Sequence, residues 1–282
     1  MDDRRERAYR SGAKIAKARM ESEAPLDAEA LAQVEASDII VVGGQYDHVE
    51  LVLEALEMPH TRVSPSQFGS VPLRLDQQLV VNCPGNVGPR AIPAIEAFVS
   101  AGGSLFTTDW ALRHVIEPAF PGLVAYNDRP TGDDVVRIEI TDHDNPFLIG
   151  VMDGQDDPQW WLEASSYPIR ILDAERVKVL IRSKELSDRY GEAPVAVLFS
   201  HGEGEVFHMI SHYYLQRTEF RSKRHTGAAM NYADEKGVFL ADADAADMAD
   251  LQLGDVEAAS TSARLFANVV AQKKRRTKEE GR

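Results

Sequence analysis

The sequence predicts an α/β fold: a parallel sheet with helices on both faces, extended by antiparallel strands in the C-terminal half. Between residues 38 and about 120, short apolar runs alternate with segments of helical spacing, which predicts βαβ crossovers. After about residue 130, strand-like runs follow one another with few helices between them. The run "DIIVVGG" is continuously apolar and ends in glycines, which is typical of a parallel strand buried on both faces.

Composition limits the classes of protein that this chain can belong to. It has 282 residues, of which 44% are hydrophobic, enough for one large domain with appendages. The net charge of -14 disfavours nucleic acid and anionic membranes as partners. The single cysteine excludes an internal disulfide, and we see no secretory leader and no apolar run long enough to cross a bilayer. We therefore expect a soluble, cytoplasmic, bacterial protein.

Charge patterning divides the chain into three parts. Residues 1–36 are charged and Ala-rich, and we expect a helical N-terminal arm, either solvated or docked on a partner or a second subunit. Residues 37–270 form the expected α/β domain, which includes an acidic loop or insertion at 217–255. Residues 271–282 form a charged tail that we expect to be disordered.

The first half of the main domain alternates strictly between strand and helix. Val49, Val52 and Leu56 share one helical face and the helix closes at Pro59, while the glycine pair at 102–103 ends another helix. The expected strands are 37–44, 60–65, 77–86 and 104–109, and the expected helices are 47–59, 89–103 and 110–120.

The second half is richer in strands. We expect strands within 133–147, 176–183 and 193–214, and the last of these reads as a hairpin that turns at residues 201–203. These strands either extend the same sheet or form an antiparallel layer beside it. A final amphipathic helix is expected at 255–272.

Asp109 ends the strand "SLFTTD" where a helix-like pattern begins. In many α/β enzymes a strand-to-helix turn of this kind holds the nucleophile. Asp109 has two interpretations that do not exclude each other. As a helix N-cap, it would accept a hydrogen bond from the N–H of residue 111 or 112. As a functional group, it would project into the crevice at the carboxyl edge of the sheet.

The stretch "NCPGNVG" lies at the end of the third expected strand. A Pro-Gly turn at this edge can present backbone N–H groups to an anion, which makes Cys83, Pro84, Gly85 and Asn86 candidate ligand-binding residues. The alternative is a plain tight turn. Cys83 itself is either a small buried apolar residue or a nucleophile, and no base lies near it in sequence.

The histidines do not predict a metal site. His208 and His212 are four residues apart in "HMISH", which on a strand separates them by roughly 13 Å. We therefore expect no metal and no cofactor, and we take His212, just past the strand end, as the better functional candidate. Trp160 and Trp161 are expected to form either a core wall or the apolar lip of a pocket.

Three stretches together resemble the class I glutamine amidotransferase-like fold, especially its trehalose-utilisation (ThuA-like) branch. They are "DIIVVGGQYDHVELVLEAL", "LVVNCPGNVGPRAIPAIEAFVSAGGSLFTTDWA" and "APVAVLFSHGEGEVFHMISHYY", and the resemblance covers roughly residues 38–215 plus the last helix. It implies a flavodoxin-like sheet, an oxyanion loop at "NCPG", a nucleophile elbow at 107–111 and a catalytic histidine at His212.

The chain departs from that family where the chemistry is done. The family carries Gly-x-Cys-x-Gly at the elbow, whereas here Asp109 takes the cysteine position and both glycines are replaced. The acid two residues after the histidine is matched by Tyr214. Thioester formation needs a thiolate and a base, so the resemblance predicts no glutaminase activity. Without the glycines, a strained elbow is harder to form.

Three functions remain open at this stage. The first is a non-catalytic, degenerate domain that binds or assembles in a bacterial cytoplasmic multiprotein system, with a protein partner or a homo-oligomer. The second is a hydrolase or isomerase acting on a small polar or carbohydrate ligand through Asp109 and His212, with Trp110 and Tyr214 beside the "NCPG" residues as ligand contacts. The third is a structural homo-oligomer that exchanges residues 1–36.

Overall fold

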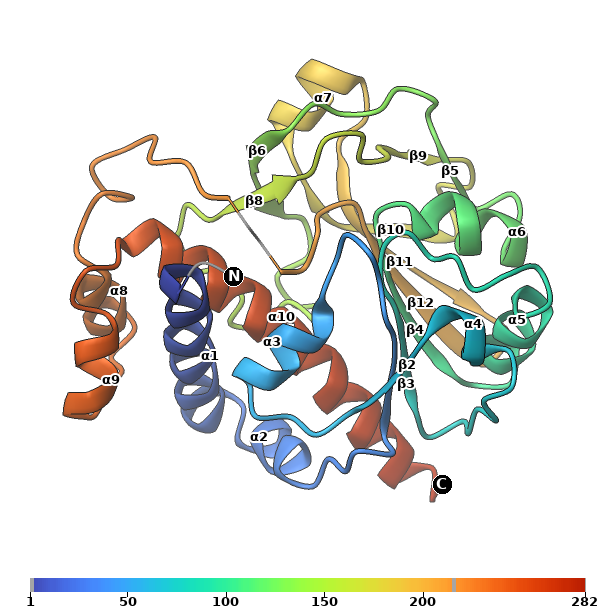
Figure 1. The fold of residues 1–282 in the computed structure, drawn as a ribbon, viewed down its shortest axis with the longest axis horizontal. Helices are drawn as coiled ribbons and strands as arrows, with labels where there is room; N and C mark the ends of the chain where they lie inside the picture. The colour runs from blue at the N-terminus through green and yellow to red at the C-terminus, as the bar shows by residue number, and fades with distance from the viewer. Residues whose placement is uncertain (1–2, 215–216, 282) are drawn as a thin grey trace.

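The computed structural model describes residues 3–214 and 217–281. Within them, one mixed sheet of eight strands runs in the order β2-β1-β3-β4-β12-β11-β10-β7 (Figure 1). This arrangement confirms the predicted α/β fold class. The strands are β1 (Ile39–Val42), β2 (Thr61–Val63), β3 (Gln78–Val81), β4 (Ser104–Thr108), β7 (Glu139–Ile140), β10 (Val177–Arg182), β11 (Pro194–His201) and β12 (Gly204–Met209).

Four strands of the second half, β7, β10, β11 and β12, extend the same sheet. β1 to β4 pair in parallel, β12 adds to β4 in parallel, and β11 and β10 follow antiparallel to their neighbours. The predicted hairpin is confirmed, because His201 pairs with Gly204 across a two-residue turn. In the β4–β12 register Phe207 lies beside Phe106, so aromatic rings stack in the centre of the core.

Helices cover both faces of the sheet. Figure 1 shows α3 and α10 on one face and α5 and α6 on the other. Phe266 of α10 packs edge-on against Phe106 of β4, which joins this helix to the sheet. The helices are α1 (Asp3–Glu23), α2 (Pro25–Ala32), α3 (Val49–Ala55), α4 (Pro65–Phe68), α5 (Ile92–Ser100), the π-helical turn η1 (Leu112–Ile116), α6 (Glu117–Ala119), α7 (Lys184–Tyr190), α8 (Ala229–Glu235), α9 (Asp242–Asp247) and α10 (Leu253–Glu279).

Two small antiparallel ribbons form a layer beside the sheet, which is the alternative that the sequence left open. They pair β5 (Val124–Tyr126) with β9 (Ile169–Ile171), and β6 (Asp134–Arg137) with β8 (Gln159–Leu162). The segment 163–168 joins β8 to β9, and it packs against the carboxyl end of β4. The ribbons therefore supply part of the candidate site described below.

The N-terminal segment is part of the core rather than a solvated arm. α1 and α2 are separate helices that meet near Pro25, as the sequence suggested. However, α1 packs along α10, and Tyr9, Ile15 and Met20 are at most 1% exposed. The expectation of an exposed extension is wrong because one face of α1 carries enough apolar side chains to bury.

The expected disordered tail at 271–282 is also wrong for its described part. α10 continues as a helix to Glu279. Its cationic side chains find acidic partners on neighbouring elements, for example Arg275 at 2.8 Å from Asp27. A run of like charge therefore forms an ordered helix here because other parts of the fold neutralise it.

The acidic segment 217–255 folds beside α1. α8, the segment after α9 and the start of α10 share a second small core with α1. Arg10 of α1 lies 3.1 Å from Asp247, and Lys14 of α1 pairs with Asp244. The cations of α1 and the acids of this segment therefore complement each other within one chain.

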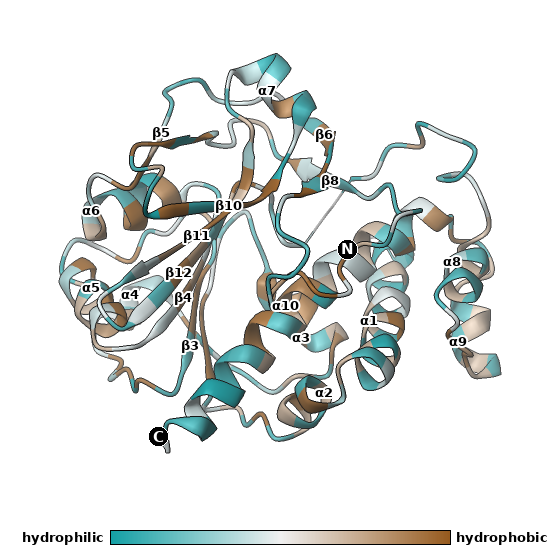
Figure 2. Ribbon diagram, turned by 180° about the vertical axis from the view of Figure 1, so that it is seen from behind, coloured by the Kyte–Doolittle hydropathy of each residue, from teal (hydrophilic) through white to brown (hydrophobic). Residues whose placement is uncertain are grey.

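Hydropathy follows the layers of the fold. Figure 2 shows apolar residues concentrated in the strands and polar residues on the outer faces of the helices. None of the helices in the described part of the chain is long and apolar enough to cross a membrane.

Gly204→Ala tests the close packing at the amino end of β12. A Cβ atom at this position would lie 2.1 Å from the Val99 carbonyl oxygen and 2.3 Å from that of Gly103. Because both neighbours are backbone atoms, we expect a loss of about 3 kcal/mol in the free energy of unfolding, measured by urea titration. Gly69→Ala is the control, since its site is open. Equal midpoints for the two variants would contradict the packing.

Candidate functional site

Three loops meet at the carboxyl edge of the sheet. β3, β4 and β12 are neighbours and run in parallel, so their carboxyl ends share one edge, where α/β proteins place their ligands. Cys83 follows β3, Asp109 follows β4 and His212 follows β12. One donor atom from each of these three buried side chains lies within 4.8 Å of the other two. The fold thus brings together three residues that are far apart in the sequence.

Asp109 occupies a strained turn and does not cap a helix. Its backbone φ is +44°, in the left-handed region that residues other than glycine rarely adopt. Its Oδ1 accepts the Tyr167 N–H at 2.8 Å, and its Oδ2 accepts the Ser166 hydroxyl at 3.0 Å. The helical turn Leu112–Ile116 receives no side-chain cap. The cap interpretation is therefore wrong, and the strained elbow forms without the family's glycines.

His212 lies between two carboxylates. Its Nε2 donates to Asp109 Oδ2 at 3.0 Å, and the side chain is 1% exposed. Its Nδ1 lies 2.9 Å from a Glu163 oxygen, which is ion-pair distance, although the two are not aligned as a hydrogen bond. Tyr214, which the resemblance matches to the family's acid, instead stacks its ring on that of Tyr9 at 4.6 Å.

The protonation of the site follows from burial and charge. Burial alone would lower the pKa of His212, but its hydrogen bond to Asp109 and its contacts with Cys83 and Glu163 raise that pKa well above the ordinary value. Burial raises the pKa of Asp109, although the hydrogen bond from His212 acts to lower it. With a carboxylate on either side of the ring, the proton of the Asp109–His212 pair belongs on His212.

Cys83 is a buried neutral thiol. Its Sγ lies 3.8 Å from Asp109 Oδ2, and burial raises the pKa of the thiol to about 12 against the opposing effect of His212. Its backbone N–H donates to the Thr108 hydroxyl, and that of Gly85 donates to the Asn82 carbonyl. These two N–H groups therefore already donate to protein oxygens, so they do not serve the anion-binding turn that the sequence predicted.

A small pocket opens onto these three residues. Its volume is about 180 Å³. Trp110 is half-buried, its indole donates to the Ser165 carbonyl at 2.7 Å, and Tyr46 packs edge-on against it at 5.3 Å. The residues that line the pocket are Tyr46, Cys83, Asp109, Trp110, Glu163, Ala164, Ser165 and His212.

The other predicted ligand contacts lie outside that lining. Pro84 and Gly85 are buried in the neighbouring turn, Asn86 is exposed, and Tyr214 packs on α1. No ligand tests these residues, so their binding role stays a prediction, as does that of Cys83 and Trp110, which do line the pocket.

Two further candidates belong to the core. Trp160 is fully buried and its indole donates to the Thr261 hydroxyl, whereas Trp161 packs edge-on against the His212 ring at 5.5 Å, so of the two it is Trp161 that packs beside the site. His208 is fully buried, its Nδ1 lies 2.8 Å from the Thr107 hydroxyl, and burial lowers its pKa to about 3. Neither tryptophan lines the pocket, and His208 is a neutral core residue.

Asp47 is a site residue that sequence reasoning missed. Its buried carboxylate accepts the N–H of Tyr213 at 2.9 Å, that of Tyr214 at 3.1 Å and that of His48 at 2.7 Å. It thereby holds the backbone that immediately follows His212. The signal was available, since Asp47 follows β1 at the same carboxyl edge of the sheet.

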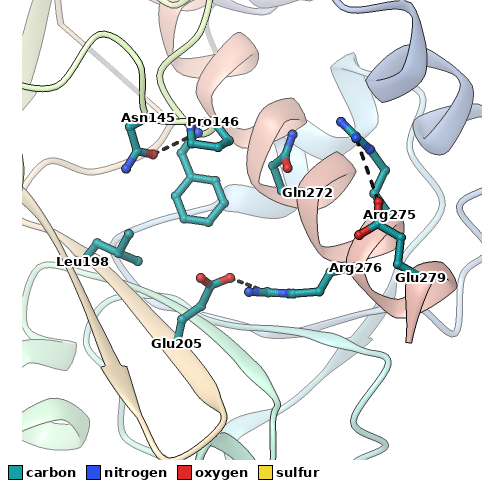
Figure 3. A pocket seen from close by; sticks show the side chains of 9 residues that line it. Asn145, Pro146, Leu198, Glu205, Gln272, Arg275, Arg276 and Glu279 are labelled. Carbon is teal, nitrogen blue, oxygen red and sulfur yellow. Dashed lines mark hydrogen bonds and ion pairs between the residues drawn. The ribbon is translucent and has the colours of Figure 1, made fainter. Parts of the chain in front are cut away.

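A second pocket, of about 290 Å³, lies at the other end of the sheet between β12 and α10 (Figure 3). There Arg276 pairs with Glu205, and Arg275 pairs with Glu279 at 4.0 Å. Its charged groups are engaged with one another, and it lies away from the carboxyl edge. We therefore place the candidate site at Cys83, Asp109 and His212.

Comparison with known proteins gives only distant structural similarity. No protein-family model and no curated protein sequence matches the chain. A protein described as a GMP synthase component from Thermoplasma acidophilum is 15% identical, with a TM-score of 0.47, over 66% of this chain and 87% of its own. A ThuA-like protein from Bacteroides uniformis is 13% identical, with a TM-score of 0.47, over 64% of this chain and 83% of its own.

A third similar structure is much longer than this chain. An exo-β-1,4-mannosidase from an Opitutaceae bacterium is 10% identical, with a TM-score of 0.44, and the match spans 62% of this chain but only 31% of that enzyme. With TM-scores below 0.5, none of these similarities assigns a function. The function proposed below therefore rests on the geometry of the site.

Asp47→Ala tests the support of the His212 loop. The substitution leaves buried N–H groups of Tyr213 and Tyr214 without an acceptor, so we expect the free energy of unfolding to fall by about 3 kcal/mol. Asp144→Ala, at an exposed aspartate, should change it by less than about 0.5 kcal/mol. Urea unfolding measures both variants, and similar values for the two would show that Asp47 does not hold this loop.

Proposed function

We propose that this chain is a hydrolase acting on a small polar or carbohydrate substrate in the pocket above Asp109 and His212. One observation carries the proposal. The Asp109 carboxylate, on a left-handed turn at the carboxyl edge of the sheet, lies 3.0 Å from the His212 imidazole at the base of an open pocket. This is the arrangement of an acid–base pair placed to meet a ligand.

The energetic cost of the arrangement supports a functional role. A non-glycine residue in a sparsely populated backbone region costs roughly 1–3 kcal/mol. Burying an ion pair is often no more stable than burying apolar side chains of the same volume. Asp109 and His212 combine both features in one place. A scaffold without chemistry has no need of either.

The groups around the pocket have distinct tasks in this proposal. Asp109 holds the His212 ring through Nε2, and Ser166 and Tyr167 hold Asp109. The Glu163 side chain is 35% exposed and lines the pocket in front of His212. Glu163 is thus the carboxylate placed to accept a proton from a hydrolytic water, while His212 fixes its position.

The pocket favours a small ligand with one apolar face. A volume of about 180 Å³ admits a single sugar ring or the end of a longer chain. Trp110 and Tyr46 pack against each other in the lining, which also contains the charged side chains of Asp109, Glu163 and His212. Aromatic faces beside polar groups suit a sugar or a similar amphipathic ring.

Glutamine is not the substrate that we expect. The elbow carries a carboxylate, and the sole thiol, Cys83, lies next to that carboxylate at 3.8 Å. A negative neighbour opposes the thiolate that thioester formation requires. A non-catalytic assembly role is motivated by the missing elbow thiol, the charged N-terminal segment and the acidic segment. The missing thiol excludes thioester chemistry alone, and the two charged segments pack against each other within this chain.

The test is turnover of chromogenic p-nitrophenyl esters, glycosides and phosphates, with glutamine included. We expect turnover of one class, no ammonia release from glutamine, and a fall of at least about 100-fold in kcat for Asp109→Asn and His212→Gln. His201→Gln is the matched control, because its imidazole pairs with Glu96 at 2.6 Å at the opposite edge of the sheet.

The control should retain wild-type kcat. Failure of the wild-type chain to turn over any member of the panel would reject the hydrolase. An equal loss in His201→Gln would show that stability, rather than the site, limits activity.

A further inference from the structure

Cys83, Asp109 and His212 offer a thiol, a carboxylate and an imidazole to one point in space. The His212 Nε2 is 3.0 Å from Asp109 Oδ2, and the Cys83 Sγ is 3.8 Å from the same oxygen. In the described part of the chain, these three residues form the one group of at least three His, Cys, Asp or Glu donors within 4.8 Å of one another. All three side chains are buried.

The separations fit a tetrahedral metal centre. With bonds of about 2.0–2.2 Å to nitrogen and oxygen and 2.3 Å to sulfur, tetrahedral ligands lie roughly 3.3–3.7 Å apart. The His212–Asp109 and Cys83–Asp109 distances bracket that range. A mixed thiolate, imidazole and carboxylate set is suited to Zn²⁺, whereas Mg²⁺ and Ca²⁺ take oxygen ligands.

The residues around His212 and Asp109 are placed to hold these two side chains as metal ligands. A histidine that binds a metal through one ring nitrogen usually directs the other at a carboxylate, and His212 Nδ1 faces Glu163 at 2.9 Å. Asp109 receives the Ser166 hydroxyl and the Tyr167 N–H, which fix its orientation while leaving lone pairs for a further ligand.

The site also has an open side. The three donors line the same pocket of about 180 Å³. Three protein ligands with access for a water or a substrate characterise catalytic zinc sites, whereas structural sites have four protein ligands.

We propose that Cys83, Asp109 and His212 bind one Zn²⁺ ion, with Glu163 next to the second ring nitrogen of His212. Its catalytic meaning rests on the proposed function: a bound zinc ion lowers the pKa of its water toward neutrality, which would supply the nucleophile of the hydrolase. Two of the three donors become anionic when they bind, so a divalent cation balances their charge in the buried site.

The first test is binding of the metal alone to the full chain under reducing conditions. After dialysis against a chelator, calorimetric titration with zinc chloride should give one ion per chain. Titration with cobalt chloride should produce a thiolate-to-cobalt charge-transfer band in the near ultraviolet. Because the chain has a single cysteine, such a band can arise only from Cys83. Absence of both signals in the wild-type chain would overturn the proposal, and this arm requires no variant to fold.

Variants identify the ligands. Cys83→Ser should abolish the cobalt band, and Asp109→Asn and His212→Gln should weaken zinc binding by about 100-fold or more. Glu163→Gln should weaken it by about 10-fold to 100-fold, as expected for a residue that holds a ligand. His201→Gln, which changes a His–carboxylate pair elsewhere in the fold, should bind like the wild type. Wild-type affinity in both Cys83→Ser and His212→Gln would also overturn the proposal.

The outcomes separate this inference from the proposed function. Zinc binding without turnover of any substrate would support the metal site and reject the hydrolase. Turnover that survives complete removal of metal by a chelator would support the hydrolase and reject the zinc ion as its cofactor.

Discussion

The Asp109 carboxylate lies buried at the edge of the sheet, and a buried charge without partners costs several kcal/mol. Three donors from two different regions supply the partners: Tyr167 and Ser166 from the segment after β8, and His212 from the loop after β12. The β5–β9 and β6–β8 ribbons are what hold the first of these regions in place. The layer that looks like an addition to the fold is therefore needed for the buried carboxylate.

His212 depends in turn on elements from both ends of the chain. Asp47 holds the backbone after it, and the Tyr9 hydroxyl of α1 donates to the Tyr213 carbonyl at 3.0 Å. The Tyr213 hydroxyl donates to the Ser262 carbonyl of α10. α1 is tied to the acidic segment by ion pairs, so the N-terminal helix links that segment to the site. These distant segments form one structure because each neutralises or satisfies groups of another.

The sequence predicted the elements whose patterns are local. β1, β3 and β4 read as continuous apolar runs, and the β11–β12 hairpin reads from its Gly-Glu-Gly turn. The sequence-based prediction was wrong for side chains whose ion-pair or hydrogen-bond partners lie far away in the chain. The charges of α1 and of residues 271–279 look solvated until their acidic partners are known. Asp109 looks like a helix cap by the local rule, because nothing in the sequence announces that Ser166, Tyr167 and His212 compete for its oxygens.

The candidate site likewise contains residues that a local pattern predicts and residues that it does not. Cys83, Asp109 and His212 could be named because each follows a predicted strand at one sheet edge, and parallel strands bring those ends together. Glu163 could not, because it lies in the irregular segment between β8 and β9, two short strands that the sequence did not predict. A metal site was not expected either, since spacing rules compare neighbours such as His208 and His212, whereas these three donors come from three separate loops.

Relative to the resembled family, thiol and carboxylate occupy unexpected loops. The Asp109 carboxylate follows β4, where the resemblance would place a nucleophile, and the Cys83 thiol follows β3, where the resemblance would place an oxyanion loop. The N–H of Cys83 is bound to Thr108, so that turn cannot stabilise an oxyanion through it. Loops arranged for thioester chemistry would aim a nucleophile and hydrogen-bond donors at a substrate. Here the same loops bring three electron-pair donors within 4.8 Å of one another, and this arrangement supports the proposed Zn²⁺ site.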